Sequence, residues 1–338
     1  PPANEEQIRY FMAVNSTSLH LRQNPSASWQ KTKISRGAVG EMALFRQPDI
    51  YGMTALGSRH NQEDATAAFR HGGYTYAVVA DGMGGHGDGE IASHMTIRNF
   101  ERAIRHGLSL EDAVRQSHDY IIKYIDHYPS VKAQGMGTTL SAARIAQNKI
   151  TVVHSGDSPI YLVKRDGPIL LAALPHINLI SELEKDYFIG AVPDELSTML
   201  VELRDLLRAN GAAPYPERVI DLLISSESWL KECNLHPNLI NNLISLTSGL
   251  GFELPSGTPT VSELVGVNPG DRLLIASDGL NLKTPDLKEV LSQKLPADET
   301  ARRLIEKRGE SGDNISVLIY EYSESEADRL QSRLKKLE

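Results

Sequence analysis

Cysteine is almost absent from this sequence, since Cys233 is its only copy among 338 residues. A single cysteine excludes an internal disulfide, and we therefore expect the protein in a reducing compartment such as the cytoplasm. The first residues lack the apolar region of a signal peptide. A secreted effector that uses no signal peptide is the alternative to a cytoplasmic protein.

Long apolar runs are also missing. No stretch approaches the roughly 18 to 20 apolar residues of a membrane helix, so the sequence predicts no membrane span. Nucleic-acid binding is not expected either, because 35 Lys and Arg stand against 43 Asp and Glu, a net charge of −8. The hydrophobic content of 41% is nevertheless enough to bury a substantial core, in one large domain or two modest ones.

Several aspartates stand at the ends of apolar runs, where burial of a charged carboxylate costs free energy. They follow the runs Tyr76 to Ala80 (Asp81), Leu273 to Ser277 (Asp278) and Ile150 to Val153 (Asp157), and they precede Ile315 to Ile319 (Asp313). Each run is predicted to be a buried strand. Carboxylates that converge there need positive compensation, which divalent metal ions usually supply. Glycine beside these aspartates is also typical of ordinary turns, and for any single pair that simpler interpretation is favoured.

Six short motifs follow one another along the chain: Arg59 with Glu63 and Asp64, Asp81 to His86, Gly137 to Thr139, Gly156 to Ser158, Ser277 to Gly279, and Gly312 to Asn314. This ordered set resembles the metal-dependent serine/threonine protein phosphatases, the PPM or type 2C family. It spans most of the chain and is highly specific. The form Asp-Gly-Met-Gly-Gly-His at residues 81–86 is similar to the bacterial branch of that family.

The resemblance implies an α+β fold, a four-layer α-β-β-α sandwich of two antiparallel sheets flanked by helices. The alternation of short strands with amphipathic helices supports this fold independently. We divide the chain into an accessory N-terminal segment (1–50), a phosphatase domain (51–322) with an enlarged helical flap at about 175–255, and a C-terminal helix (323–338). The flap is expected to gate substrate or to dock a partner, and an insertion without function is the alternative.

Apolar periodicity places the individual elements. Strands are expected at residues 51–57, 66–69, 74–80, 138–145, 150–154, 160–164, 272–276 and 314–320. Helices are expected at 90–106, 110–127, 179–188, 195–208, 216–223, 237–246, 287–291 and 300–307. The short link at Gly156 and Asp157 predicts antiparallel pairing of the strands on either side of it.

The resemblance also implies a metal cofactor, Mn²⁺ or Mg²⁺, bound as two ions. By motif match Asp81 bridges the ions, Gly82 lends its backbone carbonyl, and Asp278 and Asp313 are direct ligands on one side. The predicted activity is hydrolysis of phosphoserine and phosphothreonine in a phosphorylated protein. A water that bridges the two ions would attack, because that water must be made nucleophilic at neutral pH.

Three further acidic residues extend the implied metal site. Glu63 and Asp64 match positions that hold the second ion, directly or through water. Asp157 with Asp278 matches the third, weaker metal site of many family members, while a turn cap is an equally favoured role for Asp157. Pro159 follows Gly156-Asp157-Ser158, where the family commonly has arginine, so the function of that arginine is absent or supplied elsewhere.

Catalytic roles are assigned to residues around this metal site. Arg59 matches the phosphate-binding arginine, and an ion pair with one carboxylate is its alternative. His86 is a candidate general acid for the leaving oxygen, or a partner of an aspartate or a water. Thr138 and Thr139 are expected to pack and hydrogen-bond beneath the site.

Two other functions stay open beside protein dephosphorylation. One is a catalytically silent relative that binds phosphoproteins through the flap, and the other is a metal-dependent phosphatase of a small phosphoester. A carboxylate is retained at every matched metal position that needs one, which favours a catalyst over a silent relative.

Overall fold

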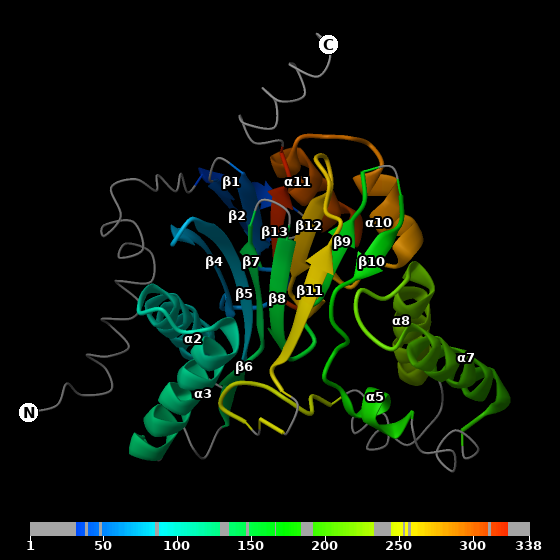
Figure 1. The fold of residues 1–338 in the computed structure, drawn as a ribbon, viewed down its shortest axis with the longest axis horizontal. Helices are drawn as coiled ribbons and strands as arrows, with labels where there is room; N and C mark the ends of the chain where they lie inside the picture. The colour runs from blue at the N-terminus through cyan, green and yellow to red at the C-terminus, as the bar shows by residue number, and fades with distance from the viewer. Residues whose placement is uncertain are drawn as a thin grey trace, which may run out of the picture.

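Two antiparallel β-sheets form the middle of the molecule (Figure 1). The computed structural model describes residues 32–37, 40–46, 49–84, 88–128, 135–146, 149–165, 167–183, 192–232, 245–252, 254–255, 258–309 and 312–323. The seven-stranded sheet has the order β1 (Thr32–Gly37), β2 (Gly40–Arg46), β3 (Ile50–Ala55), β13 (Ile315–Glu321), β12 (Arg272–Ala276), β9 (Ile160–Val163) and β10 (Ile169–Leu171). The six-stranded sheet has the order β11 (Thr260–Val265), β8 (Lys149–Ser155), β7 (Leu140–Ile145), β5 (Tyr74–Gly84) and β4 (Asp64–His71), with β6 (Met136–Thr138) paired to β5.

Helices cover the outer face of each sheet. Helices α2 (Asp88–Arg105) and α3 (Leu110–His127) lie over the six-stranded sheet. On the other side lie α5 (Asn178–Glu182), α7 (Asp194–Asn210), α8 (Glu217–Glu232), the short 3-10 helix η2 (Asp278–Leu280), α10 (Thr284–Leu291) and α11 (Ala297–Arg308). No helix in the described ranges is both long enough and apolar enough to cross a membrane.

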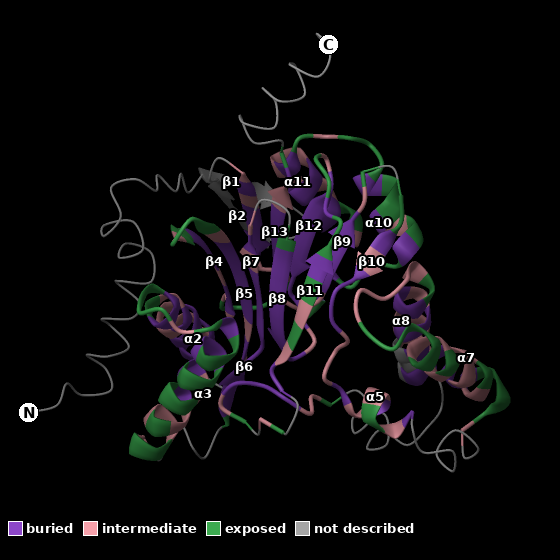
Figure 2. Cartoon of the chain, in the orientation of Figure 1, coloured by how far each residue is buried: buried purple, intermediate pink, exposed green. Residues whose placement is uncertain are grey.

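Alternate residues of one strand belong to different cores, as the period of two requires. Val78 of β5 packs against α2 and α3, while its neighbour Val79 packs between the two sheets. Leu274 of β12 faces the helices of the opposite side, and Ile275 faces the inter-sheet core. Figure 2 shows β12 and the middle of β5 as buried. Three cores separate four layers, and the predicted sandwich is confirmed.

One predicted strand pair is wrong. The strands on either side of Gly156 and Asp157 do not form a hairpin, because β8 lies in the six-stranded sheet and β9 in the seven-stranded one. Gly156 has φ +118°, a left-handed value that glycine tolerates. The link therefore carries the chain from one sheet to the other, and β9 pairs with β12 and β10.

Most other predicted elements are present with shifted ends. Helix α8 continues to residue 232, nine residues beyond the predicted end at 223. Strands β1 and β2 extend the seven-stranded sheet within the segment expected to be accessory. The predicted helices at 237–246 and 323–338 lie outside the described residues. The domain division itself stays a prediction.

Candidate metal centre and active site

A cavity of about 270 Å³ lies where the two sheets present their strand ends. Asp81 lies in the last part of β5 of one sheet, and Asp278 and Asp313 follow β12 and precede β13 of the other sheet. Every predicted site residue except Asp64 and His86 lines this cavity: Arg59, Glu63, Asp81, Gly82, Asp157, Asp278 and Asp313, together with Met83, Gly84 and Thr139. His86 lies outside the described residues, so its role stays a prediction.

The backbone of Asp81 is held from beneath by two buried threonines. Its N–H donates to Thr139 Oγ1 (3.0 Å), and its carbonyl accepts from Thr139 N (2.9 Å) and Thr138 Oγ1 (2.8 Å). Thr139 Oγ1 also lies 2.7 Å from Ser158 Oγ. The two threonines therefore fix the position from which the Asp81 carboxylate enters the cavity.

Gly82 occupies a space that admits no side chain. A Cβ atom there would lie 2.1 Å from the carbonyl oxygen of Gly89 and 2.6 Å from that of Glu63. The Gly82 N–H donates to the same Glu63 carbonyl (3.2 Å). The close approach of three backbone segments thus explains the glycine and brings Glu63 next to the end of β5.

Asp64 lies behind the cavity rather than on its lining. It is buried, it faces Asp81 across the β4–β5 ladder, and its Oδ2 accepts from Ser277 Oγ (2.8 Å). Its Oδ1 is buried without a hydrogen-bond partner. Burial, and then the charges of Asp278 and Asp313, raise the pKa of Asp64 to about 7.

Arg59 bridges two sides of the cavity. Its Nη2 donates to Asp313 Oδ2 (2.8 Å), its Nε donates to the carbonyl of Gly312 (2.9 Å), and Nη1 lies 4.0 Å from Glu63 Oε2. The ion pair that the sequence leaves as an alternative is therefore present. Nearly half of the Arg59 side chain is exposed (46%), so the guanidinium is also accessible to an incoming anion.

Asn314 is a positioning residue whose role the sequence does not reveal. Its Nδ2 donates to the carbonyls of Leu56 (2.8 Å) and Asn61 (3.0 Å), and its Oδ1 accepts from Glu63 N (2.8 Å). One amide thereby ties the loop that carries Arg59 to the start of β13. The motif at 312–314 contains this asparagine, but only the folded chain shows its partners.

The residues of the cavity fit a divalent cation in donor type and in charge. Carboxylate and backbone oxygens are the ligands that Mg²⁺ and Mn²⁺ prefer. Burial, followed by repulsion from Asp64, Asp278 and Asp157, raises the pKa of Asp81 well above its usual range, and a bound cation would reverse that shift. Within the described part of the chain, no three acidic, histidine or cysteine side chains already form a metal-ligand group. The carboxylates thus line one cavity, but they are not gathered closely enough to ligate a single ion.

The sequence and the fold both match known phosphatases. Residues 51–312 match the family model of protein phosphatase 2C. The serine/threonine phosphatase Stp of Listeria innocua is 28% identical over 278 residues, which cover 78% of this chain and 91% of that protein. PstP of Mycobacterium tuberculosis is 30% identical over 286 residues, and the match covers 79% of this chain but only 44% of PstP.

Solved structures agree with these matches. The crystal structure of Mycobacterium tuberculosis PstP superimposes with a TM-score of 0.59 at 27% identity, and covers 83% of this chain and 99% of that one. The PstP catalytic domain in complex with two manganese ions gives a TM-score of 0.54 at 25% identity, over 83% and 98% of the two chains. The predicted similarity to the bacterial branch is confirmed. The chain therefore belongs to the protein phosphatase 2C family, the metal-dependent serine/threonine phosphatases that its motifs resemble.

Proposed function

We propose that this chain removes phosphate from phosphoserine and phosphothreonine in proteins with the help of two Mn²⁺ or Mg²⁺ ions. The observation that carries the proposal is the gathering of Asp81, Asp278 and Asp313 with Arg59 on one cavity between the sheets. The relatives named above are serine/threonine phosphatases, and one related structure contains two manganese ions.

Each residue has a distinct part in this proposal. Asp81, the carbonyl of Gly82, Asp278 and Asp313 would hold the ions, with Glu63 nearby as a further acidic partner. When bound, two such ions lower the pKa of an attacking water and neutralise charge on the phosphoryl group.

Residues around this set complete the proposed site. Asp64, buried opposite Asp81 in the β4–β5 ladder, would add negative charge behind the ions. Asp157, which lines the cavity beside Asp278, would hold the third, weaker ion.

Arg59 would bind the phosphoryl group of the substrate. A guanidinium can donate two parallel hydrogen bonds to phosphate oxygens. Its present bonds to Asp313 and the Gly312 carbonyl place it at the rim of the cavity. Exchange of the Asp313 carboxylate for a phosphate oxygen would keep the guanidinium paired and would leave the Asp313 carboxylate available to hold a cation.

Phosphate release from a phosphothreonine peptide tests the proposal. The native chain is titrated with Mn²⁺ or Mg²⁺ against a chelator and compared with Asp278→Asn and with Asp194→Asn, an exposed aspartate in the first turn of α7. We expect metal-dependent release from the native chain and the Asp194 variant, and a loss of about 100-fold or more, as for other essential electrostatic groups, in the Asp278 variant. Hydrolysis confined to small esters would point to a small-molecule phosphatase, and binding without turnover would point to a silent relative.

A further inference from the structure

A second cavity, of about 120 Å³, adjoins the carboxylate cavity. Asp157 and Asp278 line both cavities, so the two spaces meet at these side chains. Asn281, which is exposed, stands at the same end. A part of the substrate that extends from the carboxylate cavity past these two aspartates would therefore enter the second cavity.

Most of the remaining lining of the second cavity is apolar. Its walls include Tyr161 of β9, Leu171 of β10, and Ile220 and Leu223 of α8, each less than a tenth exposed. Figure 1 shows α8 beside the end of the seven-stranded sheet formed by β9 and β10. The cavity thus lies between this sheet edge and a helix of the segment that the sequence predicts to be a flap.

The helical wall is anchored to the sheet. Leu171 and Tyr215 exchange two backbone hydrogen bonds (2.9 and 2.7 Å), and the N–H of Ile169 donates to Glu217 Oε1 (2.7 Å) at the first residue of α8. Lys288 of α10 pairs with the other oxygen of Glu217 (2.6 Å). These contacts hold the start of α8 in place, so the cavity exists before a ligand arrives.

A buried histidine completes the wall without adding charge. Ser141 Oγ donates to the carbonyl of Ser158 (2.6 Å), so it accepts from His154 Nδ1, which lies 2.9 Å away. Burial, and then the neighbouring His176, lower the pKa of His154 to about 3, and the ring is neutral at pH 7. The second ring nitrogen, Nε2, has no hydrogen-bond partner. The histidine therefore adds no charge to the wall of the cavity.

The volume sets the size of an occupant. An apolar protein cavity of about 150 Å³ holds one benzene molecule. A space of about 120 Å³ accordingly accommodates one side chain of the size of leucine, isoleucine or methionine. Adjacent residues of an extended peptide are about 3.3 Å apart, so a residue one or two positions from the phosphorylated one would reach a neighbouring cavity.

We propose that this cavity is the substrate subsite for an apolar side chain that flanks the phosphorylated serine or threonine. The inference rests on the proposed function and extends it, because it assigns substrate selection to α8. Ile224 of α8 is half-buried and lines the cavity. Its side chain therefore sets the size of the subsite.

Phosphothreonine peptides with alanine, leucine or aspartate at each of the four positions nearest the phosphorylated residue test the proposal. With Mn²⁺ present, kcat/KM is measured for the native chain, for Ile224→Trp, which fills the cavity, and for Ile224→Ala, which enlarges it. Met199→Trp is the matched control, since Met199 is a half-buried residue of α7 that packs on the same core but does not line the cavity. Thermal unfolding verifies that each variant is folded.

We expect leucine at one position to raise kcat/KM by about tenfold over alanine, the discrimination typical of an apolar pocket. The leucine-to-alanine ratio should fall toward one in Ile224→Trp, shift toward larger side chains such as phenylalanine in Ile224→Ala, and stay unchanged in Met199→Trp. Equal rates on all peptides, or a preference that persists in folded Ile224→Trp, would overturn the subsite while leaving the phosphatase intact. Absence of metal-dependent hydrolysis of every peptide and of p-nitrophenyl phosphate would overturn the phosphatase and the subsite together.

Discussion

Among single residues, Gly82 controls how closely β5 approaches the first turn of α2. The change Gly82→Ala places a Cβ about 2 Å from backbone atoms that cannot rotate away. We expect it to separate Glu63 from the end of β5, to destabilise the protein by about 3 kcal/mol or more, and to abolish phosphate release. Urea unfolding and phosphopeptide hydrolysis measure the two effects.

Gly107→Ala is the control for Gly82→Ala. Gly107 has φ +86°, but a Cβ atom added to it would meet nothing within 4 Å. The substitution therefore costs only the local strain of a Cβ atom at positive φ, about 1–2 kcal/mol. Activity should survive in this variant. Full activity in Gly82→Ala would show that the close backbone contact does not position the site.

The free energy of unfolding is expected to depend on pH through the protonation of His176. Its Nδ1 accepts from Gly156 N (3.2 Å), its Nε2 lies 2.9 Å from Thr260 Oγ1, and burial lowers its pKa to about 4. The unfolded chain binds a proton below about pH 6.5 while the folded chain does not until about pH 4. The stability that neutral His176 contributes is therefore present above about pH 6.5 and is lost as the pH falls toward 4.

Urea unfolding at pH 7 and pH 5 tests this dependence with His176→Gln, whose amide oxygen can still accept from Gly156. We expect the native chain to lose about 2 kcal/mol more than the variant between the two pH values. His106→Gln, at an exposed histidine, should behave as the native chain does. An equal loss in the native chain and in His176→Gln would contradict the assignment.

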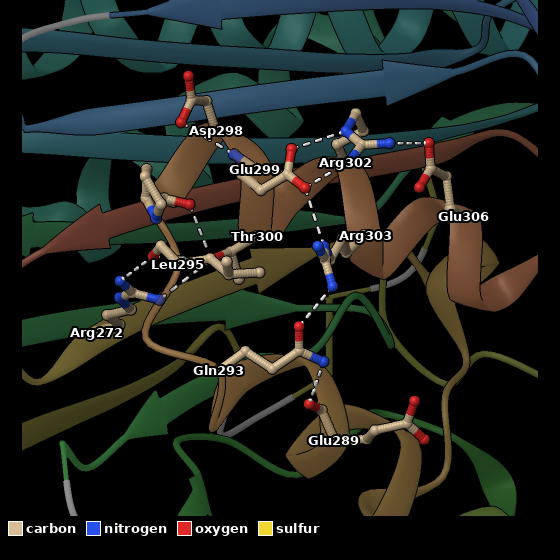
Figure 3. Close-up of polar contacts among 11 residues, drawn as sticks. Arg272, Glu289, Gln293, Leu295, Asp298, Glu299, Thr300, Arg302, Arg303 and Glu306 are labelled. Atoms are coloured by element: carbon tan, nitrogen blue, oxygen red, sulfur yellow. Dashed lines mark hydrogen bonds and ion pairs between the residues drawn. The ribbon is translucent and has the colours of Figure 1, made fainter.

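At the scale of elements, the loop before α11 is fastened to the sheet by Arg272 (Figure 3). Its Nη2 donates to the carbonyl of Leu295 (2.6 Å) and its Nη1 to Thr300 Oγ1 (3.2 Å). The hydrogen bond to Thr300 is buried, and the one to Leu295 is partly buried. Arg272→Met removes these two hydrogen bonds, and we expect a loss of about 1–3 kcal/mol in urea unfolding.

The exposed side of α11 provides the comparison for Arg272. Glu299 accepts from Arg302 and Arg303 in the network of Figure 3, and these hydrogen bonds lower its pKa to about 2. Because solvent and salt screen such surface pairs, Glu299→Gln should change stability less than Arg272→Met and less again in high salt. A larger effect from Glu299→Gln would show that the surface network, and not Arg272, holds the helix.

The elements themselves were predictable wherever the local pattern was strong. The amphipathic period places α3, and the apolar run before Asp81 places most of β5. Local sequence could not show that β8 and β9 belong to different sheets, because the long-range pairing of β9 with β12 decides it. The partners of Asn314 were hidden for the same reason, since they lie more than 250 residues away.

At the scale of the whole molecule, the acidic cavity lies between the two sheets, and both sheets contribute to its lining. Asp81 extends from β5 of the six-stranded sheet, whereas Asp278 follows β12 and Asp313 precedes β13 of the seven-stranded sheet. Each sheet alone would supply an incomplete set of the proposed oxygen ligands. The motif carboxylates except Asp64 line this cavity, but the cross-sheet position of the cavity depends on the packing of the inter-sheet core.

A cation held by both sheets should therefore stabilise the entire fold. We expect Mn²⁺ to raise the unfolding temperature of the native chain, because an ion that binds only the folded state adds about 2.7 kcal/mol at a concentration about 100 times its Kd. Asp278→Asn should reduce this rise, a chelator should reverse it, and Asp194→Asn should keep it. Since unfolding is measured without substrate, the result is independent of turnover. An equal rise in Asp278→Asn and in the native chain would mean that Mn²⁺ binds elsewhere, and the two-sheet metal site would have to be abandoned.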